Sequence, residues 1–480
     1  MVMDQRDKQR WRGGATDTCK NSDKQIYEVV TTGQAAASEA EQYHEAIFNA
    51  LKEEDPHVYD LIIREHERLQ NTLQLIAAEN RCSPAVLAAL GSIIQNKTAE
   101  GFPGARYHGG CEVVDDVETL AIQRANEVFG SQYANVQPHS GTSANHVVLT
   151  AMLEAGDQIL SLGLDQGGHL SHGANVSFTG KFFRVENYCV DKETFLLDYE
   201  AIRKLAIKVK PRLIICGATA YARTIDFKRF REIADEVGAF LLADISHISG
   251  LVIAGAHPSP INHAHFTTTS TYKPGGPRGG VILMGRDHDQ RINVGGKALT
   301  LSEHIEKTVF PGVQGTPLLN NVAAKAVFFK EALEEEYQTR QFKIIENAKR
   351  LAADLHNLGH DVLTNGTDNH MVLINVANFK KGLTGAIAQQ CLEDCDIIVN
   401  RNKLPFDKRS VAVTSGIRLG TPIVTRSLMG PDEMDRIAHL IDAIFKEVEI
   451  ARTGRYRIDP AFREHNNRQV GQLCSEFPMR

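Results

Sequence analysis

Residues 139–145, His-Ser-Gly-Thr-Ser-Ala-Asn, combine hydroxyl side chains with a glycine just ahead of an apolar helical run. Such a turn points backbone N–H groups and hydroxyls at one spot, which suits a phosphate group. A helix start that is simply capped by a hydroxyl has the same pattern. The segment alone therefore predicts either a phosphate site or an ordinary helix cap.

A second segment places a carboxylate at the end of an apolar run. Asp244 follows Leu-Leu-Ala, and His247 comes shortly after it. A carboxylate at the end of a buried strand is costly unless it has a partner. A protonated pyridine nitrogen is one such partner, because an aspartate keeps that ring charged and able to accept electrons. An aspartate that caps the next turn is an equally good interpretation.

A third segment sets a lysine between a hydroxyl-rich run and a glycine-rich loop. Lys273 follows Thr-Thr-Thr-Ser-Thr-Tyr and precedes Pro-Gly-Gly-Pro-Arg-Gly-Gly. A buried lysine has a lowered pKa and can attack an aldehyde as the free amine. A single lysine is ordinarily solvated, but these flanks are not those of a solvated surface run. The order of phosphate turn, aspartate and lysine is that of fold-type-I pyridoxal-phosphate (PLP) enzymes.

Eight ordered motifs extend this likeness over most of the chain, from about residue 45 to 450. They are Leu-Ile-Ala-Ala-Glu-Asn at 75–80, Arg-Tyr-His-Gly-Gly at 106–110, Asn-Val-Gln-Pro-His-Ser-Gly at 135–141, Gly-Gly-His-Leu-Ser-His-Gly at 167–173, the Asp244/His247 segment, the Lys273 loop, Phe-Pro-Gly-Val-Gln-Gly at 310–315 and Thr-Ser-Gly-Ile-Arg-Leu-Gly-Thr at 414–421. In these motifs the chain resembles the serine hydroxymethyltransferases, which move a hydroxymethyl group between serine and tetrahydrofolate.

The resemblance implies a role for each matching residue. Lys273 would form the Schiff base with pyridoxal 5'-phosphate, Asp244 would hold the pyridine nitrogen, and His169 would stack on the ring. The remaining cofactor-binding residues would be Ser140, Gly141 and Thr142 at the phosphate, Gly315 of a neighbouring subunit, and Thr219 and His247 near the ring oxygen. Glu100 would be the acid/base carboxylate, which makes the expected catalytic set Lys273, Glu100, His169, Asp244 and His247.

Substrate contacts follow from the same resemblance. Arg418 would grip the substrate carboxylate in a fork, which a lysine could not do as well. Tyr107, Leu164 and Asn402 match positions that line the folate pocket, with tetrahydrofolate as co-substrate. The family forms dimers or dimers of dimers with sites built across the interface, so a homodimer or homotetramer is expected. No resident metal is expected, since no ligand spacing for zinc is present.

Five departures from the family pattern lie at the expected site. Thr98 and His108 replace tyrosines, Ala78 replaces a serine, Tyr272 replaces a histidine, and the loop after Lys273 is one residue shorter than the usual one. A related branch that acts on 2-methylserine also has threonine and histidine at the positions of Thr98 and His108. Exchanging a phenol for threonine makes room near the substrate α-carbon. The predicted substrate is therefore serine or 2-methylserine, giving glycine or alanine.

Two other functions remain open from the sequence. An aldolase or transaldolase of the same fold would split 3-hydroxy amino acids without folate. Asn402, Tyr107 and Glu100 weigh mildly against it, and folate-dependent turnover separates the two activities. A non-catalytic family member acting as a binding or scaffold subunit is the second alternative. Lys273, Asp244 and Arg418 weigh against it, and a yellow purified protein would exclude it.

The elements that must position these residues alternate along the chain. Short apolar runs at 159–162, 212–216, 240–243 and 281–284 predict buried strands, while 114–129 and 227–237 have helical spacing. This alternation predicts an α/β fold with a mostly parallel sheet, and the family resemblance implies the PLP-dependent transferase fold type I. After about residue 330, a charged helix at 330–358, strands at 371–376 and 396–399 and a helix at 432–450 predict a smaller α+β domain. The expected domains are a disordered lead at 1–40, an N-terminal arm at 41–95, a large PLP-binding domain at 96–330 and a small domain at 331–480.

Composition excludes several classes of protein. The chain has 480 residues, of which 42% are hydrophobic and 23% charged, with a net charge of −6 and no basic stripe. These values argue against a nucleic-acid-binding protein, and no run approaches the roughly 20 apolar residues of a membrane span. The N-terminus lacks the apolar core of a signal peptide. Eight scattered cysteines without short spacing predict ordinary thiols in a reducing, cytoplasmic compartment.

Overall fold

The computed structural model describes residues 49–451 and 455–479. The predicted lead at 1–40 and the first residues of the predicted arm lie outside this range. Contacts divide the chain into a unit that ends at Glu67 and a second unit, Arg68–Arg480. Helix α3 (Pro56–Asn71) begins in the first unit. The sheets, cores and candidate site described below belong to the second unit.

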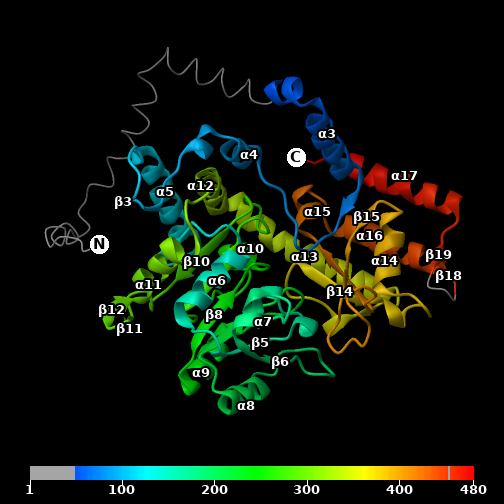
Figure 1. Ribbon diagram of the computed structural model, residues 1–480. Helices are drawn as coiled ribbons and strands as arrows, with labels where there is room; N and C mark the ends of the chain where they lie inside the picture. The colour runs from blue at the N-terminus through cyan, green and yellow to red at the C-terminus, as the bar shows by residue number, and fades with distance from the viewer. Residues whose placement is uncertain (1–48, 452–454, 480) are drawn as a thin grey trace. The chain divides into compact units, whose positions relative to one another are not determined.

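A seven-stranded sheet forms the centre of the larger part of this unit, drawn mostly in cyan and green in Figure 1. Its strand order is β4-β10-β9-β8-β7-β5-β6. The pairs from β6 to β9 are parallel, and β10 runs antiparallel to both of its neighbours. The strands are β4 (Tyr133–Asn135), β5 (Gln158–Leu162), β6 (Arg184–Tyr188), β7 (Leu213–Cys216), β8 (Phe240–Asp244), β9 (Phe266–Ser270) and β10 (Gly280–Met284). The predicted α/β fold with a mostly parallel sheet is confirmed.

The sheet is buried on both faces, which is why its strands read as unbroken apolar runs. In β10, Val281 and Leu283 belong to one core, while Ile282 and Met284 belong to another. Successive side chains of a strand point to opposite faces, so each strand feeds both cores. Helices complete the two layers: α5 (Glu112–Phe129), α8 (Tyr199–Val209), α9 (Phe227–Val237) and α12 (Leu319–Leu333) contribute to the first core, and α6 (Gly141–Met152) and α11 (Leu301–Lys307) to the second.

The predicted strands and helices of this part agree with the observed ones to within two residues at each end. The end of helix α9 could be predicted because Gly238 takes a left-handed conformation, with φ of 66°, and ends the helix. Its start is capped by Asp226, whose side chain accepts a hydrogen bond from the backbone N–H of Arg229.

The smaller part contains an antiparallel sheet in the order β13-β14-β17-β16. Its strands are β13 (Asp361–Val362), β14 (Met371–Asn375), β16 (Asn400–Asn402) and β17 (Gly416–Gly420), and its main helices are α13 (Glu335–Asn357), α14 (Gly385–Glu393), α16 (Pro431–Glu447) and α17 (Pro460–Glu476). Figure 1 shows these elements in yellow to red. The predicted boundary near residue 330 remains a proposal.

One sequence prediction for this part needs correction, and one strand that was predicted has a pairing partner that the sequence did not indicate. The single helix expected at 330–358 is broken at Glu334, whose extended backbone (ψ of 142°) separates α12 from α13. The strand expected at 396–399 is the short β15 (Ile397–Ile398), which does not join the four-stranded sheet. It pairs in parallel with β1 (Leu73–Gln74), from the predicted N-terminal arm. A pairing partner so distant in sequence cannot be read from a local pattern.

Lys325 of α12 is a fully buried lysine that donates hydrogen bonds to backbone carbonyls at the edge of the large sheet. Its Nζ donates to the carbonyls of Val136 (2.6 Å), Pro138 (3.2 Å) and Gly280 (2.9 Å). Burial lowers the pKa of Lys325 to about 7. The contacts at 136 and 138 lie immediately before the predicted phosphate turn, so this lysine fixes the strand end from which that turn starts.

We expect Lys325→Met to lower the free energy of unfolding by about 2–4 kcal/mol, because three buried carbonyls lose their donor. Denaturant unfolding monitored by circular dichroism measures this loss. Lys330→Met is the matched control, since Lys330 is an exposed lysine on the same helix. Equal effects of the two substitutions would contradict the structural role given to Lys325.

Candidate active site

The predicted site residues follow the carboxyl ends of neighbouring strands. Asp244 is the last residue of β8, Lys273 comes shortly after β9, Thr219 after β7 and Leu164 after β5. Because β5, β7, β8 and β9 are parallel, their carboxyl ends meet at one edge of the sheet. Open α/β sheets bind ligands at this edge.

The predicted phosphate turn is the N-terminus of α6. Ser140 is the N-cap, and its Oγ accepts a hydrogen bond from the backbone N–H of Ser143 at 3.0 Å. The turn is also packed closely: a Cβ added at Gly280 would lie 2.2 Å from the carbonyl oxygen of Ser140. Both interpretations of the segment are thus compatible with the structure, since the helix is capped and its first residues, Gly141 and Thr142, line a cavity.

The Asp244 carboxylate is buried and receives three hydrogen bonds. Its Oδ2 accepts from Asn145 Nδ2 (2.7 Å) and lies 2.9 Å from His172 Nε2. Its Oδ1 accepts from the backbone N–H of Ser246 at 3.0 Å, which is the turn-capping contact expected as the alternative. The backbone N–H of His169 lies 3.3 Å from His172 Nδ1. That nitrogen is therefore the acceptor, and the ring proton on Nε2 points at Asp244.

The charges of this cluster are set by burial and by these contacts. Burial alone would raise the pKa of Asp244, but hydrogen bonding and charge from His172 dominate and hold the pKa well below its usual range. Burial lowers the pKa of His169 to about 4 and that of His247 well below its ordinary value. At neutral pH the structure thus presents an ionised carboxylate near the neutral imidazole rings of His169 and His247.

Lys273 extends into the same space as Asp244. Its Nζ donates to Ser270 Oγ at 3.0 Å, and its backbone carbonyl accepts from Asn80 Nδ2 at 3.1 Å. Asp244 and Lys273 both line a cavity of about 210 Å³. The lining consists of Ser140, Gly141, Thr142, His169, His172, Ala218, Thr219, Asp244, Ser246, His247, Ser270, Tyr272, Lys273 and Arg278.

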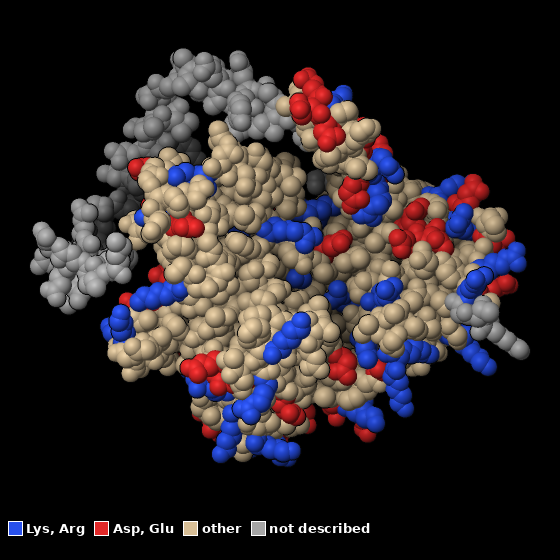
Figure 2. All heavy atoms as spheres, viewed as in Figure 1, with Lys and Arg blue, Asp and Glu red and all other residues tan. Residues whose placement is uncertain are grey.

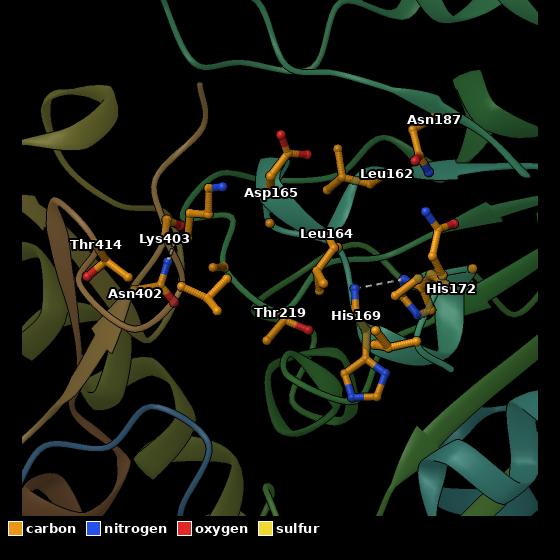
Figure 3. Close-up of a pocket in the computed structure, with 18 of the residues that line it drawn as sticks. Leu162, Leu164, Asp165, His169, His172, Asn187, Thr219, Asn402, Lys403 and Thr414 are labelled. Carbon is orange, nitrogen blue, oxygen red and sulfur yellow. Dashed lines mark hydrogen bonds between the residues drawn. The ribbon is translucent and has the colours of Figure 1, made fainter. Parts of the chain in front are cut away.

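A larger cavity of about 540 Å³ adjoins the first and shares His169, His172 and Thr219 with it. Figure 3 shows Leu164 and His169 on one side of this cavity and Asn402, Lys403 and Thr414 on the other. It therefore lies between the strand ends of the large sheet and the region of β16. Figure 2 shows basic side chains across the middle of this face of the molecule.

Arg418, in β17, lines neither cavity but contacts Thr219, which lines both. Its Nη1 donates to the Thr219 carbonyl at 2.5 Å, and its Nε donates to Asn400 Oδ1 at 3.1 Å. The side chain is only 6% exposed, and burial lowers its pKa to about 10. Within residues 49–451 and 455–479, no carboxylate forms an ion pair with it. A buried guanidinium without a counter-charge favours an anionic ligand.

The other predicted residues form a separate group. Glu100 and Tyr107 are joined by a backbone hydrogen bond of 2.9 Å, and the N–H of Glu100 lies 3.4 Å from His108 Nδ1. A Cβ added at Gly315 would lie 3.5 Å from Glu100 Oε1. In the part of the chain that the structure describes, neither cavity is lined by Thr98, Glu100, Tyr107, His108 or Gly315. The chain alone does not bring this group to Lys273.

Comparison with known protein families gives one match. The family model described as serine hydroxymethyltransferase matches residues 51–441 of the chain. The chain belongs to the serine hydroxymethyltransferase family. This membership confirms the predicted family and the PLP-dependent fold type I. It supports PLP-dependent hydroxymethyl transfer in general, and tetrahydrofolate is the co-substrate of the family. No helix among the described residues is long and apolar enough to cross a membrane.

The residues present fit the cofactor of this family. The donors around Asp244 keep the carboxylate ionised at the floor of the small cavity, as a protonated ring nitrogen requires. The imidazole Nδ1 of His247 is buried and has no hydrogen-bond partner among the described residues, so a polar group of a ligand can satisfy it. His169, His172 and Asp244 also place ligand atoms within 4.8 Å of one another, a spacing that a metal could use. The absence of a resident metal stays a prediction.

Sequence reasoning missed the residues that hold Asp244. Asn145 and His172 both lie inside motifs of the sequence, at 139–145 and 167–173, but the motifs did not predict a role for either residue. Asn145 lies one helical turn after Gly141 on the buried side of α6, among apolar neighbours. A polar side chain on an apolar helix face is the signal that could have identified it.

Proposed function

We propose that the chain catalyses the reversible transfer of the hydroxymethyl group of serine, or of 2-methylserine, to tetrahydrofolate. The products are glycine, or alanine, together with 5,10-methylenetetrahydrofolate and water. The observation that carries the proposal is the small cavity itself. It combines an ionised, buried Asp244, the amine of Lys273 and the N-terminus of α6 in one space.

Each of these groups has a task that its surroundings support. Lys273 would bind the cofactor aldehyde, Asp244 its ring nitrogen, and Ser140, Gly141 and Thr142 its phosphate. His169 would stack on the ring, and Thr219 and His247 would contact the ring oxygen. When bound, PLP supplies an electron sink for the pair of electrons released at the substrate α-carbon. Asp244 keeps that sink effective because its donors stabilise the negative charge.

Arg418 would orient the amino-acid substrate. Its guanidinium is held by Thr219 and Asn400, so the direction of its remaining N–H groups is fixed before substrate arrives. A bidentate contact with the substrate carboxylate would supply the missing counter-charge. The folate would occupy the adjoining larger cavity, against Leu164 and Asn402. Arg401 and Lys403 line that cavity and favour an acidic co-substrate.

We further propose a homodimer or homotetramer in which each site is completed by a second copy. Glu100 contacts both Tyr107 and His108 and lies beside Gly315, and none of these residues lines the cavity that contains Lys273. Thr98, Tyr107 and Gly315 are exposed, and Tyr107 retains 83% of its accessible surface. A group of expected site residues that is partly exposed and does not line the cavity of Lys273 supports a site shared between copies. The seven described cysteines are free thiols, which supports our proposal of a cytoplasmic location.

The test is a screen of hydroxy amino acids with and without tetrahydrofolate. We expect glycine from serine and alanine from 2-methylserine, both dependent on folate. Thr98→Tyr should lower 2-methylserine turnover more than serine turnover, by roughly 10-fold or more, because a phenol fills the space available to the methyl group. Turnover without folate would favour the aldolase alternative. If only serine reacts, the prediction of a site widened at Thr98 is wrong, and the enzyme is a serine/glycine hydroxymethyltransferase.

A further inference from the structure

Tyr272, one of the departures from the family pattern, lies close to two cations of the small cavity. Lys273 Nζ lies 4.5 Å from the centre of the Tyr272 ring, and the guanidinium carbon of Arg278 lies 4.4 Å from it. Both distances are within the range in which a cation is attracted by the face of an aromatic ring. All three side chains line the cavity that also contains Ser140, Gly141 and Thr142.

The short loop after Lys273 returns Arg278 to this position. The N–H of Gly276 donates to the Thr271 carbonyl at 3.0 Å, and the N–H of Thr271 donates to the Gly279 carbonyl at 3.1 Å. Thr271 Oγ1 donates to the Pro277 carbonyl at 2.6 Å. Gly275 has φ of 113°, a backbone conformation that permits the sharp reversal. The loop is thus held at both ends, and its fixed path brings Arg278 back against the Tyr272 ring.

Neither cation has an acidic partner. In the described part of the chain, no carboxylate forms an ion pair with Lys273 or Arg278, and Arg278 is exposed at the cavity. The N-terminus of α6 adds positive potential on the same cavity. The Arg278 guanidinium, which remains a free cation when Lys273 binds the cofactor aldehyde, and the nearby helix N-terminus attract an anion. A phosphate group is the anion that the hydroxyls of the turn also suit.

We propose that Tyr272 is a positioning residue whose ring holds the Arg278 guanidinium against the cofactor phosphate. This inference rests on the proposed function, because it takes the small cavity to be the PLP site. The ring face carries the interaction, whereas the phenolic hydroxyl is not needed for it. Tyr272 acts through Arg278, and Arg278 supplies the charge.

The experiment measures the affinity of the full-length chain, stripped of cofactor, for pyridoxal 5'-phosphate and for pyridoxal by equilibrium dialysis. The ratio of the two affinities isolates the phosphate contribution. We expect this ratio to fall at least about fivefold in Tyr272→Leu and in Arg278→Gln, a change of about 1 kcal/mol. Tyr272→Phe keeps the ring and should keep the ratio. In the double variant the ratio should be no lower than in Arg278→Gln alone, because the ring has no guanidinium left to hold.

Controls separate the possible failures. Arg286→Gln removes an exposed arginine outside both cavities and should leave the ratio unchanged. Losses that add fully in the double variant, or a normal ratio in Tyr272→Leu, would overturn the proposal. If Tyr272→Leu does not fold, an unchanged ratio in the exposed Arg278→Gln variant overturns it as well. A native chain that binds PLP no better than pyridoxal contradicts the proposed function itself.

Discussion

Lys273→Ala is expected to abolish the visible absorbance of bound cofactor and to lower hydroxymethyl transfer by roughly three orders of magnitude or more, equivalent to about 4 kcal/mol in the barrier. The cavity offers no substitute amine: among the described residues that line it, Lys273 is the one lysine. Its position against Ser270 Oγ directs the amine into the cavity.

Borohydride reduction followed by peptide mass spectrometry measures the attachment directly. In the native chain the cofactor should be fixed to the peptide that contains Lys273, and in the alanine variant no peptide should carry it. Lys330→Ala, an exposed lysine on α12, is the control and should retain both absorbance and activity. A lysine adduct that persists in Lys273→Ala would show that another residue holds the cofactor.

Local patterns predicted the elements of the large sheet because each pattern has a local cause. Unbroken apolar runs reflect burial on both faces, and alternate residues of β10 indeed enter different cores. Gly238 marks a helix end because glycine, which has no Cβ, takes the left-handed conformation there without strain. Asp244 was recognisable because a carboxylate directly after an apolar strand requires a special reason.

The parts that the sequence did not predict depend on contacts across long stretches of chain. Helix α12 turns into α13 at Glu334, a residue with no breaking tendency of its own, so the break reflects tertiary packing. The pairing of β15 with β1 joins residues more than 300 positions apart. The hydrogen bonds of Asn145 and His172 to Asp244 likewise became visible only when α6 and the segment at 167–173 were placed beside β8.

The expected site residues fall into two separate groups in the structure, and the sequence could not predict this separation either. Motif order placed Glu100 and Tyr107 in the same active site as Lys273, and the single chain puts them elsewhere. A sequence motif carries no information on which copy of the chain supplies it. Only a structure shows that the hairpin of β2 (Gly101–Phe102) and β3 (Ala105–Arg106) holds Glu100 beside Gly315 and away from the small cavity.

Asp244→Asn is expected to reduce hydroxymethyl transfer by roughly 10²–10³-fold, the scale on which a preorganised electrostatic contact contributes to catalysis. Asn145, His172 and the N–H of Ser246 all donate toward this side chain. A carboxylate accepts from all of them, whereas an asparagine must turn its NH₂ group toward at least one of these donors. The variant also loses the negative charge that, in the proposed function, would keep the ring nitrogen protonated.

The measurement is kcat for serine together with cofactor affinity by absorbance titration. We expect cofactor to bind more weakly but still to bind, because the phosphate turn and Lys273 remain. Asp442→Asn is a matched control: Asp442 is also buried, lies 3.3 Å from a histidine nitrogen (His360 Nε2) and pairs with Lys446, but it lines neither cavity. Both substitutions should destabilise the fold, since each disturbs a buried carboxylate. Only the loss at Asp244 should remove activity from protein that remains folded, and a fully active Asp244→Asn chain would mean that the ring nitrogen is held by another group.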